Sequence, residues 1–588
     1  MSESEIYIAL ATIAVFGVGG QWLGRRLGFP SLLLLLPAGL LAGDVLGLVD
    51  PEELLGDLLY PLVSLLVSLL LFQSGLQLRL IELPDHARLP VIRLLTVGLL
   101  TTFLGASLAA VAVLDVDTDL AFLLGAVVVV SGPTVVGPLL STVRARSPIG
   151  SVLNYEGTFL DPLGATLGVV MLNVVLAEDA SDVHPVLQVL GRIGLGVAVG
   201  LVVASLLVFV MSRFWLTYKM ESAVALMFAV VAFVAADVVL SEAGLFATLT
   251  LGIAAANQRR VALGPVRLFG ETLEVLIIGG LFILLGALVT IDGLRDYAWE
   301  IVLLVAALVF VVRPLTAFVS LVGTSLGWRD RALIGSIDPR GIVAASTAAS
   351  FTGSLAAAGL DSDFLLPVVF GVILGTGVIY GLAARPVARL LGVVRPPAKG
   401  IGLVGDAQWI LDLAAQLNDL GVAVLVVTAK SPEDAQNDAT RNGVPVLSLR
   451  DSRAKVREAV QSADIAEAAL CAPSNLALNL LDSRMIETMG RRRVFRLPDR
   501  DATDIRGRHA VADRSAHPFA PGITLQDITS RVDAGAVVKV IDQPATDDVL
   551  PLAAVSSDGS VNLQPGGHSP AADDALIALV SPAKSSAG

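Results

Sequence analysis

Two acidic residues, Glu156 and Asp161, lie within a long apolar segment at residues 149–176. The segment predicts a membrane-spanning helix, because about 20 apolar residues are enough to cross a bilayer. An ionisable side chain at bilayer depth costs roughly 2.5–3.5 kcal/mol even on lenient insertion scales, so such a residue usually marks the path of an ion or a proton. The pair therefore indicates ion chemistry inside a membrane.

The spacing of the two acids predicts different roles for them. Five residues at 100° each place Glu156 and Asp161 about 140° apart around a helix, so they cannot share one face. Counted from Arg144 and Arg146 at a 1.5 Å rise, Asp161 lies ~20 Å deep and Glu156 ~12 Å deep. We expect Asp161 to bind a proton or a cation near the midplane, with Glu156 closer to the cytosol. In the alternative, one acid caps a broken helix or lies in the headgroup layer.

A second polar motif, Ser131-Gly-Pro-Thr134, interrupts the apolar segment 119–142. Glycine and proline together break a helix and free backbone carbonyls. Counting back from Arg144 puts Ser131 ~20 Å deep, level with Asp161. A broken helix beside a midplane carboxylate is how secondary transporters build a cation site, so we assign Ser131 and Thr134 to that site. A simple proline kink is the alternative.

A third motif, Asp338-Pro-Arg340-Gly, interrupts the segment 332–354. Arg340 lies ~13 Å from the cytosolic charges, level with Glu156. A buried arginine needs a carboxylate, so we predict a structural ion pair between Glu156 and Arg340, with Asp338 as the alternative partner of Arg340. The two broken segments occupy corresponding places in two halves of the chain, which suggests an inverted repeat with the site at its interface.

The composition is that of a polytopic membrane protein with a soluble part attached. Of the 588 residues, 55% are hydrophobic and 16% are charged, whereas soluble domains carry about 25% charged residues. The apolar segments end near Val394. On the 20-residue rule there are about thirteen spans, at residues 4–24, 31–49, 54–73, 90–113, 119–142, 149–176, 186–211, 221–241, 243–257, 266–290, 298–321, 332–354 and 364–391.

Charge on the loops predicts the orientation of these spans. Basic loops follow the odd-numbered spans and acidic loops follow the even-numbered ones, with Arg295 as the exception. The positive-inside rule then places the N-terminus outside the plasma membrane and everything after Lys399 in the cytosol. The acidic start of the chain predicts no signal peptide.

Other counts narrow the function class. A formal net charge of −13 argues against nucleic acid, which needs a basic surface. Cys471 is the single cysteine, so a disulfide framework and a cysteine-rich metal site are excluded. We find no nucleophile–base cluster and no phosphate loop, and we therefore expect no enzyme.

The C-terminal part alternates strands and helices. After the linker at 396–400, strands are predicted at 401–404, 422–428, 444–449 and 468–472 with helices between them, a rhythm typical of a parallel, doubly wound sheet. From about Arg506 the sequence changes to short strands and turns. We predict three parts: a membrane domain at 1–395, an α/β Rossmann-like domain at 396–505 and a small lobe at 506–588.

Over about residues 1–392 the motifs together resemble the monovalent cation:proton antiporter superfamily, specifically the NhaP-type Na⁺/H⁺ exchangers. The resemblance implies a homodimer of polytopic helical subunits in lipid, each with inverted repeats and two broken helices. The matching segments are Phe72-Gln-Ser-Gly-Leu for the family's Phe-Glu-x-Gly-Leu, Ser131-Gly-Pro for Thr-Asp-Pro, the spacing of Glu156 and Asp161, Ser241-Glu-Ala-Gly-Leu-Phe-Ala, Phe282–Gly286 and Pro339-Arg-Gly.

Two departures from the family pattern remove polar ligands. Leu160 precedes Asp161 where the family often has Asn or Asp, and Gly132 stands in place of the aspartate of Thr-Asp-Pro. By analogy with the electroneutral branch, a single titratable carboxylate implies one proton per cation. The sequence does not choose between Na⁺, K⁺ and Li⁺.

The C-terminal part resembles an RCK regulatory domain of the TrkA-N type, followed by a TrkA-C-like lobe. Its dinucleotide fingerprint is altered, because Ala407 and Ile410 follow Gly405 where glycines are expected, and Thr428 stands where an acid would bind the ribose. Gly405, Ala407 and Thr428 are the candidate cofactor positions. We favour a domain that dimerises and regulates over one that binds NAD.

The function expected from these features is exchange of a monovalent cation for a proton across the cell membrane. Competition of cation and proton for Asp161 would couple the two fluxes, and rocking of one helix bundle against the other would alternate access. One alternative is a ligand-gated K⁺ efflux system of the same fold with little obligatory proton coupling. A non-transporting sensor is the other, and the broken helices argue against it.

Overall fold

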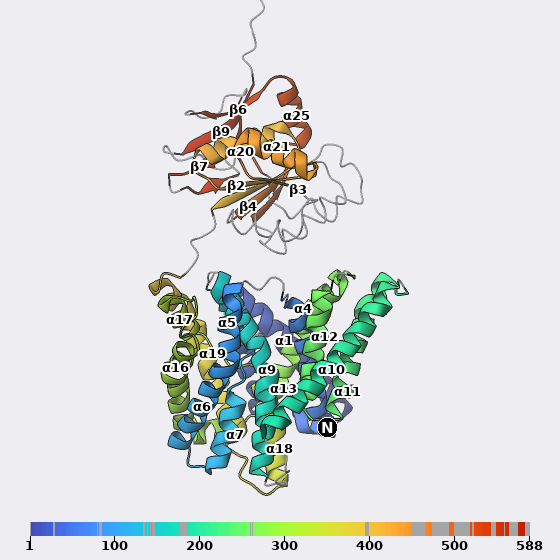
Figure 1. Ribbon diagram of the computed structural model, residues 1–588, viewed down its shortest axis with the longest axis vertical. Helices are drawn as coiled ribbons and strands as arrows, with labels where there is room; N and C mark the ends of the chain where they lie inside the picture. The colour runs from blue at the N-terminus through green and yellow to red at the C-terminus, as the bar shows by residue number, and fades with distance from the viewer. Residues whose placement is uncertain are drawn as a thin grey trace, which may run out of the picture. The chain divides into compact units, whose positions relative to one another are not determined.

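A computed structural model divides the chain into two compact units, Met1–Arg395 and Pro396–Gly588, both drawn in Figure 1. The elements of the first unit in its described part are all helices, and the second unit combines sheets and helices. The structure describes residues 2–27, 30–78, 80, 85–132, 136–137, 139–140, 143, 147–176, 185–213, 215–258, 260–261, 263–393, 399–448, 465–472, 493–498, 518–519, 522–541, 549–557, 559–563 and 574–581.

The first unit is a bundle of apolar helices. Its described elements are α1 (Glu3–Leu27), α2 (Leu32–Leu40) with η1 (Leu41–Val45), α3 (Pro51–Leu55) with η2 (Gly56–Leu58), α4 (Leu59–Gln77), α5 (Asp85–Arg93) with η4 (Leu94–Gly98), α6 (Leu99–Val113), α7 (Thr118–Val128), α9 (Ser147–Val175), α10 (Pro185–Ser212), α11 (Tyr218–Asp237), α12 (Ala243–Asn257), α13 (Gly264–Ala287), α14 (Ile291–Asp296), α15 (Ala298–Ala307) with η5 (Leu308–Val312), α16 (Arg313–Ser320), α17 (Trp328–Ile334), α18 (Ile342–Ala357) and α19 (Leu365–Leu390).

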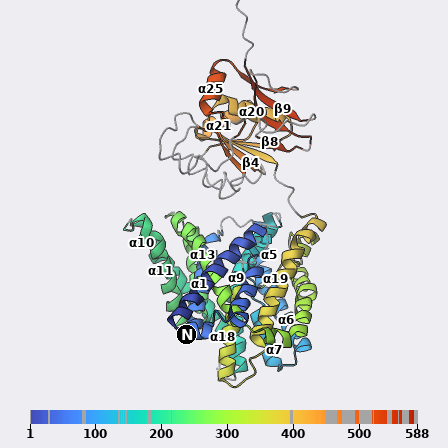
Figure 2. The same cartoon turned by 180° about the vertical axis from the view of Figure 1, so that it is seen from behind.

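The lengths and surfaces of these helices are those of a multi-pass membrane protein. Among the described residues, nine apolar helices are long enough to cross a membrane, and four shorter apolar helices accompany them. Large apolar side chains such as Leu206, Val231 and Phe310 are exposed on the outside of the bundle, where lipid rather than water suits them. Figure 2 shows the bundle from behind, with α1 and α19 toward the viewer.

Small residues let the helices approach closely, as is usual in membranes. At the contact between α4 and α12, a Cβ atom added to Gly252 would lie 2.4 Å from the carbonyl oxygen of Phe72. Only glycine fits at this crossing. The contact fixes α4 against α12, and α4 is the helix that carries one wall of the candidate site.

Two helices are interrupted within the bundle. Helix α7 ends at Val128, and the described residues 129–132 that follow it are not helical. Residues 335–341 separate α17 from α18 in the same way. Both interruptions lie at the glycine- and proline-containing motifs, because proline lacks the N–H that a helix interior requires.

The second unit contains two sheets. Its parallel sheet has the strand order β3-β2-β1-β4-β5, and its antiparallel sheet has the order β6-β9-β7-β8. Residues Trp409 and Leu413 of α20 share one hydrophobic core with Val538 and Ile577 of the second sheet, so the two sheets pack together through this helix. The elements are β1 (Gly400–Val404), α20 (Gln408–Asp419), β2 (Val424–Thr428), α21 (Pro432–Asn442), β3 (Val446–Ser448), β4 (Ile465–Leu470), β5 (Val494–Arg496), α25 (Leu525–Asp533), β6 (Val537–Ile541), β7 (Val549–Val555), β8 (Val561–Asn562) and β9 (Ala575–Val580).

Candidate functional site

Helix α9 carries both acids of the sequence analysis in the centre of the bundle. Glu156 and Asp161 are each only 3% exposed. Pro162 lies inside the helix directly after Asp161, and a proline here leaves the carbonyl of Thr158, four residues earlier, without its helical donor. The helix therefore presents a carboxylate and a freed carbonyl at neighbouring positions.

Asp161 faces a small cavity and forms no ion pair with any residue that the structure describes. Among the described residues, its Oδ1 atom has no hydrogen-bond partner. The cavity has room for about one water-sized species, and it is lined by Val67, Leu70, Leu71 and Ser74 of α4, Asp161 of α9, and Ile342 and Val343 of α18. A buried carboxyl group that faces such a space can hold a proton or one dehydrated cation.

Glu156, by contrast, forms a bidentate ion pair with Arg313. The Nη1 atom of Arg313 lies 2.7 Å from Oε1 of Glu156, and Nη2 lies 2.9 Å from Oε2. Arg313 also donates to the carbonyl of Ile334, the last residue of α17, and to the carbonyl of Ile337 in the interrupted segment that follows. One guanidinium thus neutralises a buried acid and satisfies the interrupted helix.

The predicted pair between Glu156 and Arg340 is therefore wrong. Arg340 contacts Asp338 instead, with 3.0 Å between Nη2 and Oδ2, which is the alternative partner that the sequence analysis kept open. Asp338 also lies 3.7 Å from Nε of Arg313. Equal depth in the membrane does not bring two residues together, because the residues can lie on different sides of the bundle at the same depth.

Arg313 is the functional residue that the sequence analysis missed. It lies in the interior of the predicted span 298–321 and is only 2% exposed. A buried arginine in an apolar segment is itself a signal, since ionisable residues inside membranes are rare and paired. That signal was sufficient to find the residue, although it did not identify Glu156 as the partner.

The two interrupted helices cross at the motifs that contain Ser131 and Arg340. The hydroxyl of Ser131 donates to the carbonyl of Pro339, and Nη1 of Arg340 donates to the carbonyl of Val129. A Cβ atom added to Gly341 would lie 2.9 Å from the backbone of Gly132. Each interrupted segment therefore satisfies polar groups of the other, and the glycines allow the backbones to touch.

The sequence-predicted cation ligands are placed as follows. Asp161 lines the cavity, whereas Ser131 lies at the crossing and is not among the residues that line it. Thr134 lies outside the described residues. Gly164, three residues after Asp161, packs against Val130, and a Cβ atom at Gly164 would meet Val130 at 2.5 Å. The crossing thus supports α9 close to Asp161.

In the second unit, the candidate cofactor positions lie at the carboxyl end of the parallel sheet. Gly405 follows β1, and a Cβ atom there would meet Ile410 at 2.3 Å. Ala407 precedes α20 without capping it through its side chain. Thr428 ends β2, and its hydroxyl donates to Asp406, which also accepts from the backbone N–H of Ala429. The hydroxyl that would meet a ribose is thus engaged within the protein.

Comparison with known proteins identifies the class of the first unit and then its family. Helices of membrane length, together with two shorter helices that are interrupted beside a carboxylate without an ion pair to any described residue, define a polytopic membrane transporter. Residues 9–390 match the family model described as sodium/hydrogen exchanger, transmembrane. The chain belongs to this family.

Individual relatives are distant but cover most of the membrane unit. A K⁺/H⁺ antiporter NhaP from Alkalimonas amylolytica is 24% identical over 72% of this chain and 73% of its own length. The Na⁺/H⁺ antiporter 1 of Methanocaldococcus jannaschii is 24% identical over 58% of this chain and 83% of its own length. The solved structure of the sodium proton antiporter MjNhaP1 from the same organism, at pH 8, aligns with a TM-score of 0.59 at 22% identity, over 66% of this chain and all of that one.

Proposed function

We propose that the protein exchanges a monovalent cation, Na⁺ or K⁺, for H⁺ across the cell membrane, with both ions competing for Asp161. The observation that carries this proposal is that Oδ1 of Asp161 has no hydrogen-bond partner among the described residues and lies in a cavity of about the size of one ion. Membership of the sodium/hydrogen exchanger family supports the same function.

The competition follows from the chemistry of one buried carboxyl group. When a cation enters the cavity, the O–H bond of the protonated Asp161 breaks, the proton leaves to water, and the carboxylate binds the cation. The reverse step returns the proton and releases the cation. Because one carboxylate cannot hold both ions, each transit of a cation in one direction is matched by transit of a proton in the other.

The charged cluster of Glu156, Arg313, Asp338 and Arg340 has a supporting role in this proposal. Its two acids and two bases balance, so it adds no net charge near the site. It holds α9 and the interrupted segments in register while Asp161 changes its ligand. Breaking a buried pair is costly, which suits a fixed frame better than a site that loads and unloads.

The architecture that we propose has about thirteen spans, inverted repeats, a homodimeric assembly, an outside N-terminus and a cytosolic C-terminal unit. The two interrupted helices and the family resemblance support it. Alternating access then arises from movement of the bundle that holds α9 against the helices that hold α4.

For the second unit we propose a regulatory, RCK-like role, with a Rossmann-like domain at 396–505 and a small lobe at 506–588. The parallel strand order supports the first assignment. The contacts of Asp406 with Thr428 and Ala429 support regulation without a bound dinucleotide, because the Thr428 hydroxyl, at the position where an acid would bind the ribose, is already bonded to Asp406.

The test is Asp161→Asn in proteoliposomes, with internal pH followed after addition of Na⁺, K⁺ or Li⁺. The variant is expected to be folded and to give no cation-driven pH change. Asp119→Asn, the same change at an exposed position near the start of α7, is the matched control and is expected to exchange normally. Wild-type exchange by Asp161→Asn would refute the assignment.

The same assay separates exchange from ligand-gated K⁺ efflux. An efflux system would release K⁺ without a matching pH change. The relatives named as K⁺/H⁺ and Na⁺/H⁺ antiporters favour the coupled reaction.

A further inference from the structure

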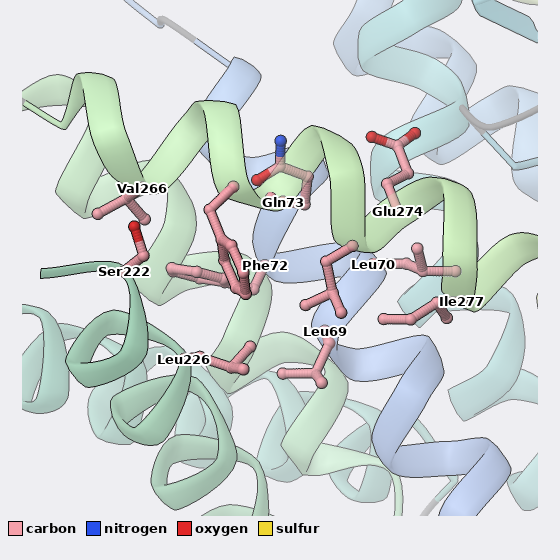
Figure 3. Close-up of a pocket in the computed structure, with 12 residues that line it drawn as sticks. Leu69, Leu70, Phe72, Gln73, Ser222, Leu226, Val266, Glu274 and Ile277 are labelled. Carbon is pink, nitrogen blue, oxygen red and sulfur yellow. The ribbon is translucent and has the colours of Figure 1, made fainter. Parts of the chain in front are cut away.

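Helix α4 carries two adjacent polar side chains that face different spaces. Residues seven apart lie nearly on one face of a helix, so Ser74 shares a face with Val67, whereas Gln73 is turned about 100° from Ser74. Val67 and Ser74 both line the cavity at Asp161. Gln73 lines a separate pocket between α4, α11 and α13, shown in Figure 3.

The contacts of Gln73 keep it in that second pocket. Its Nε2 atom donates to the carbonyl of Arg267 at 3.3 Å, and its amide packs against Gly270, where a Cβ atom would meet Oε1 at 1.9 Å. In Figure 3 the surrounding side chains are mostly apolar. Gln73 stands where the related family has a glutamate, yet it is directed away from Asp161.

Ser74 is placed differently. Apart from Asp161, it is the one polar side chain among the described residues that line the Asp161 cavity. The cavity holds about one water-sized species, so an ion in it lies within reach of both walls. A carboxylate oxygen and a hydroxyl oxygen are both ligands that hard cations prefer.

We propose that the Ser74 hydroxyl binds the transported cation together with Asp161. This inference rests on the exchange function proposed above and adds a specificity-determining ligand to it. A proton on Asp161 needs no second ligand, because it forms an O–H bond with the carboxyl group alone. Ser74 therefore contributes to the cation-loaded state and little to the protonated one.

The placement of Ser74 also connects cation binding to the movement of helices. Ser74 lies on α4, which packs tightly against α12 at Gly252, whereas Asp161 lies on α9, which packs against the crossing at Val130. A cation bound to both residues joins these two groups of helices. A proton on Asp161 forms no bond to Ser74. The cation-loaded and the protonated states therefore differ in how firmly α4 is held to α9.

The experiment compares Ser74→Ala with Ser68→Ala in the full-length protein in proteoliposomes, using Na⁺, K⁺ and Li⁺ in turn. Ser68 lies on the same helix, is buried, and donates its hydroxyl to the carbonyl of Leu65. Ser74→Ala is expected to raise the apparent KM for the cation by roughly tenfold to a hundredfold, the effect of losing one bond to a charged group, with little change in Vmax. It is also expected to change the ratio of the KM values for the three cations. Ser68→Ala is expected to keep wild-type values.

Two further variants separate a ligand from a structural residue. Ser74→Thr keeps the hydroxyl and is expected to retain most of the cation affinity. Ser74→Cys keeps the size but offers a soft sulfur atom, and it is expected to resemble Ser74→Ala. If the alanine variant does not fold, the cysteine variant still tests whether the Ser74 hydroxyl binds the cation.

Wild-type KM values in Ser74→Ala or Ser74→Cys would overturn the assignment of Ser74 as a cation ligand. A loss of cation affinity in Ser74→Thr as large as in Ser74→Ala would overturn it as well. Asp161→Asn is measured in the same series. If Asp161→Asn transports normally, the exchange mechanism itself fails. If it is inactive while Ser74→Ala behaves as wild type, only the role of Ser74 fails.

Discussion

The two acidic residues of α9, Glu156 and Asp161, are equally buried but differ in their surroundings. At Glu156, a guanidinium forms two hydrogen bonds with the carboxylate and further bonds with the interrupted helix next to it. At Asp161, no basic side chain of the described residues forms an ion pair, and a small cavity takes the place of a partner. A carboxylate with a permanent partner holds helices together, whereas one without a partner remains able to bind a mobile ion.

The largest effect is expected when the paired region is broken. Arg313→Met leaves Glu156 buried without a partner, and we expect a loss of about 3–5 kcal/mol of stability. Thermal unfolding in detergent would measure this loss. The double variant Glu156→Gln/Arg313→Met removes both charges and is expected to recover part of it. A single variant as stable as the wild type would show that the pair is not what fixes this region.

A smaller effect is expected at the crossing of the interrupted helices. Gly341→Ala places a Cβ atom 2.9 Å from the backbone of Gly132, and such overpacking costs about 1–3 kcal/mol. We expect lower stability and slower exchange. Gly353→Ala, in α18 with its nearest neighbour at 3.9 Å, is the matched control. Equal exchange rates for the two variants would mean that close contact at the crossing is not required.

The smallest effect is expected in the second unit. Asp406→Ala removes the acceptor for Thr428 and Ala429, and because Asp406 is exposed we expect a loss of only about 0.5–1.5 kcal/mol. Proteolysis of the C-terminal unit in the full-length protein at increasing urea concentration would detect it. Resistance to proteolysis identical to that of the wild type would show that the hydrogen bonds of Asp406 do not stabilise this edge of the sheet.

The sequence predicted the features that depend on position along a helix. Apolar segments and the motifs at which α7 and α17 end are set by local composition, and local rules identify them. The family resemblance followed from the order of these motifs, and the family match confirms it.

The sequence did not predict features that depend on direction around a helix axis. Depth counting paired Glu156 with Arg340, but the partner is Arg313, because tertiary packing decides which face of each helix meets which neighbour. Ser74 was not recognised as a site residue for the same reason. Only the packed structure shows that α4 turns Ser74 toward Asp161 and Gln73 away from it.

The most direct test of the central claim is the apparent KM for the transported cation as a function of pH, measured at equal pH on both sides of the vesicle. Competition for one carboxyl group predicts that, below the pKa of that group, KM rises about tenfold for each unit by which the pH is lowered. Vmax is expected to stay constant. A KM that does not change with pH over a range in which exchange slows would show that cation and proton use different groups, and would contradict the account.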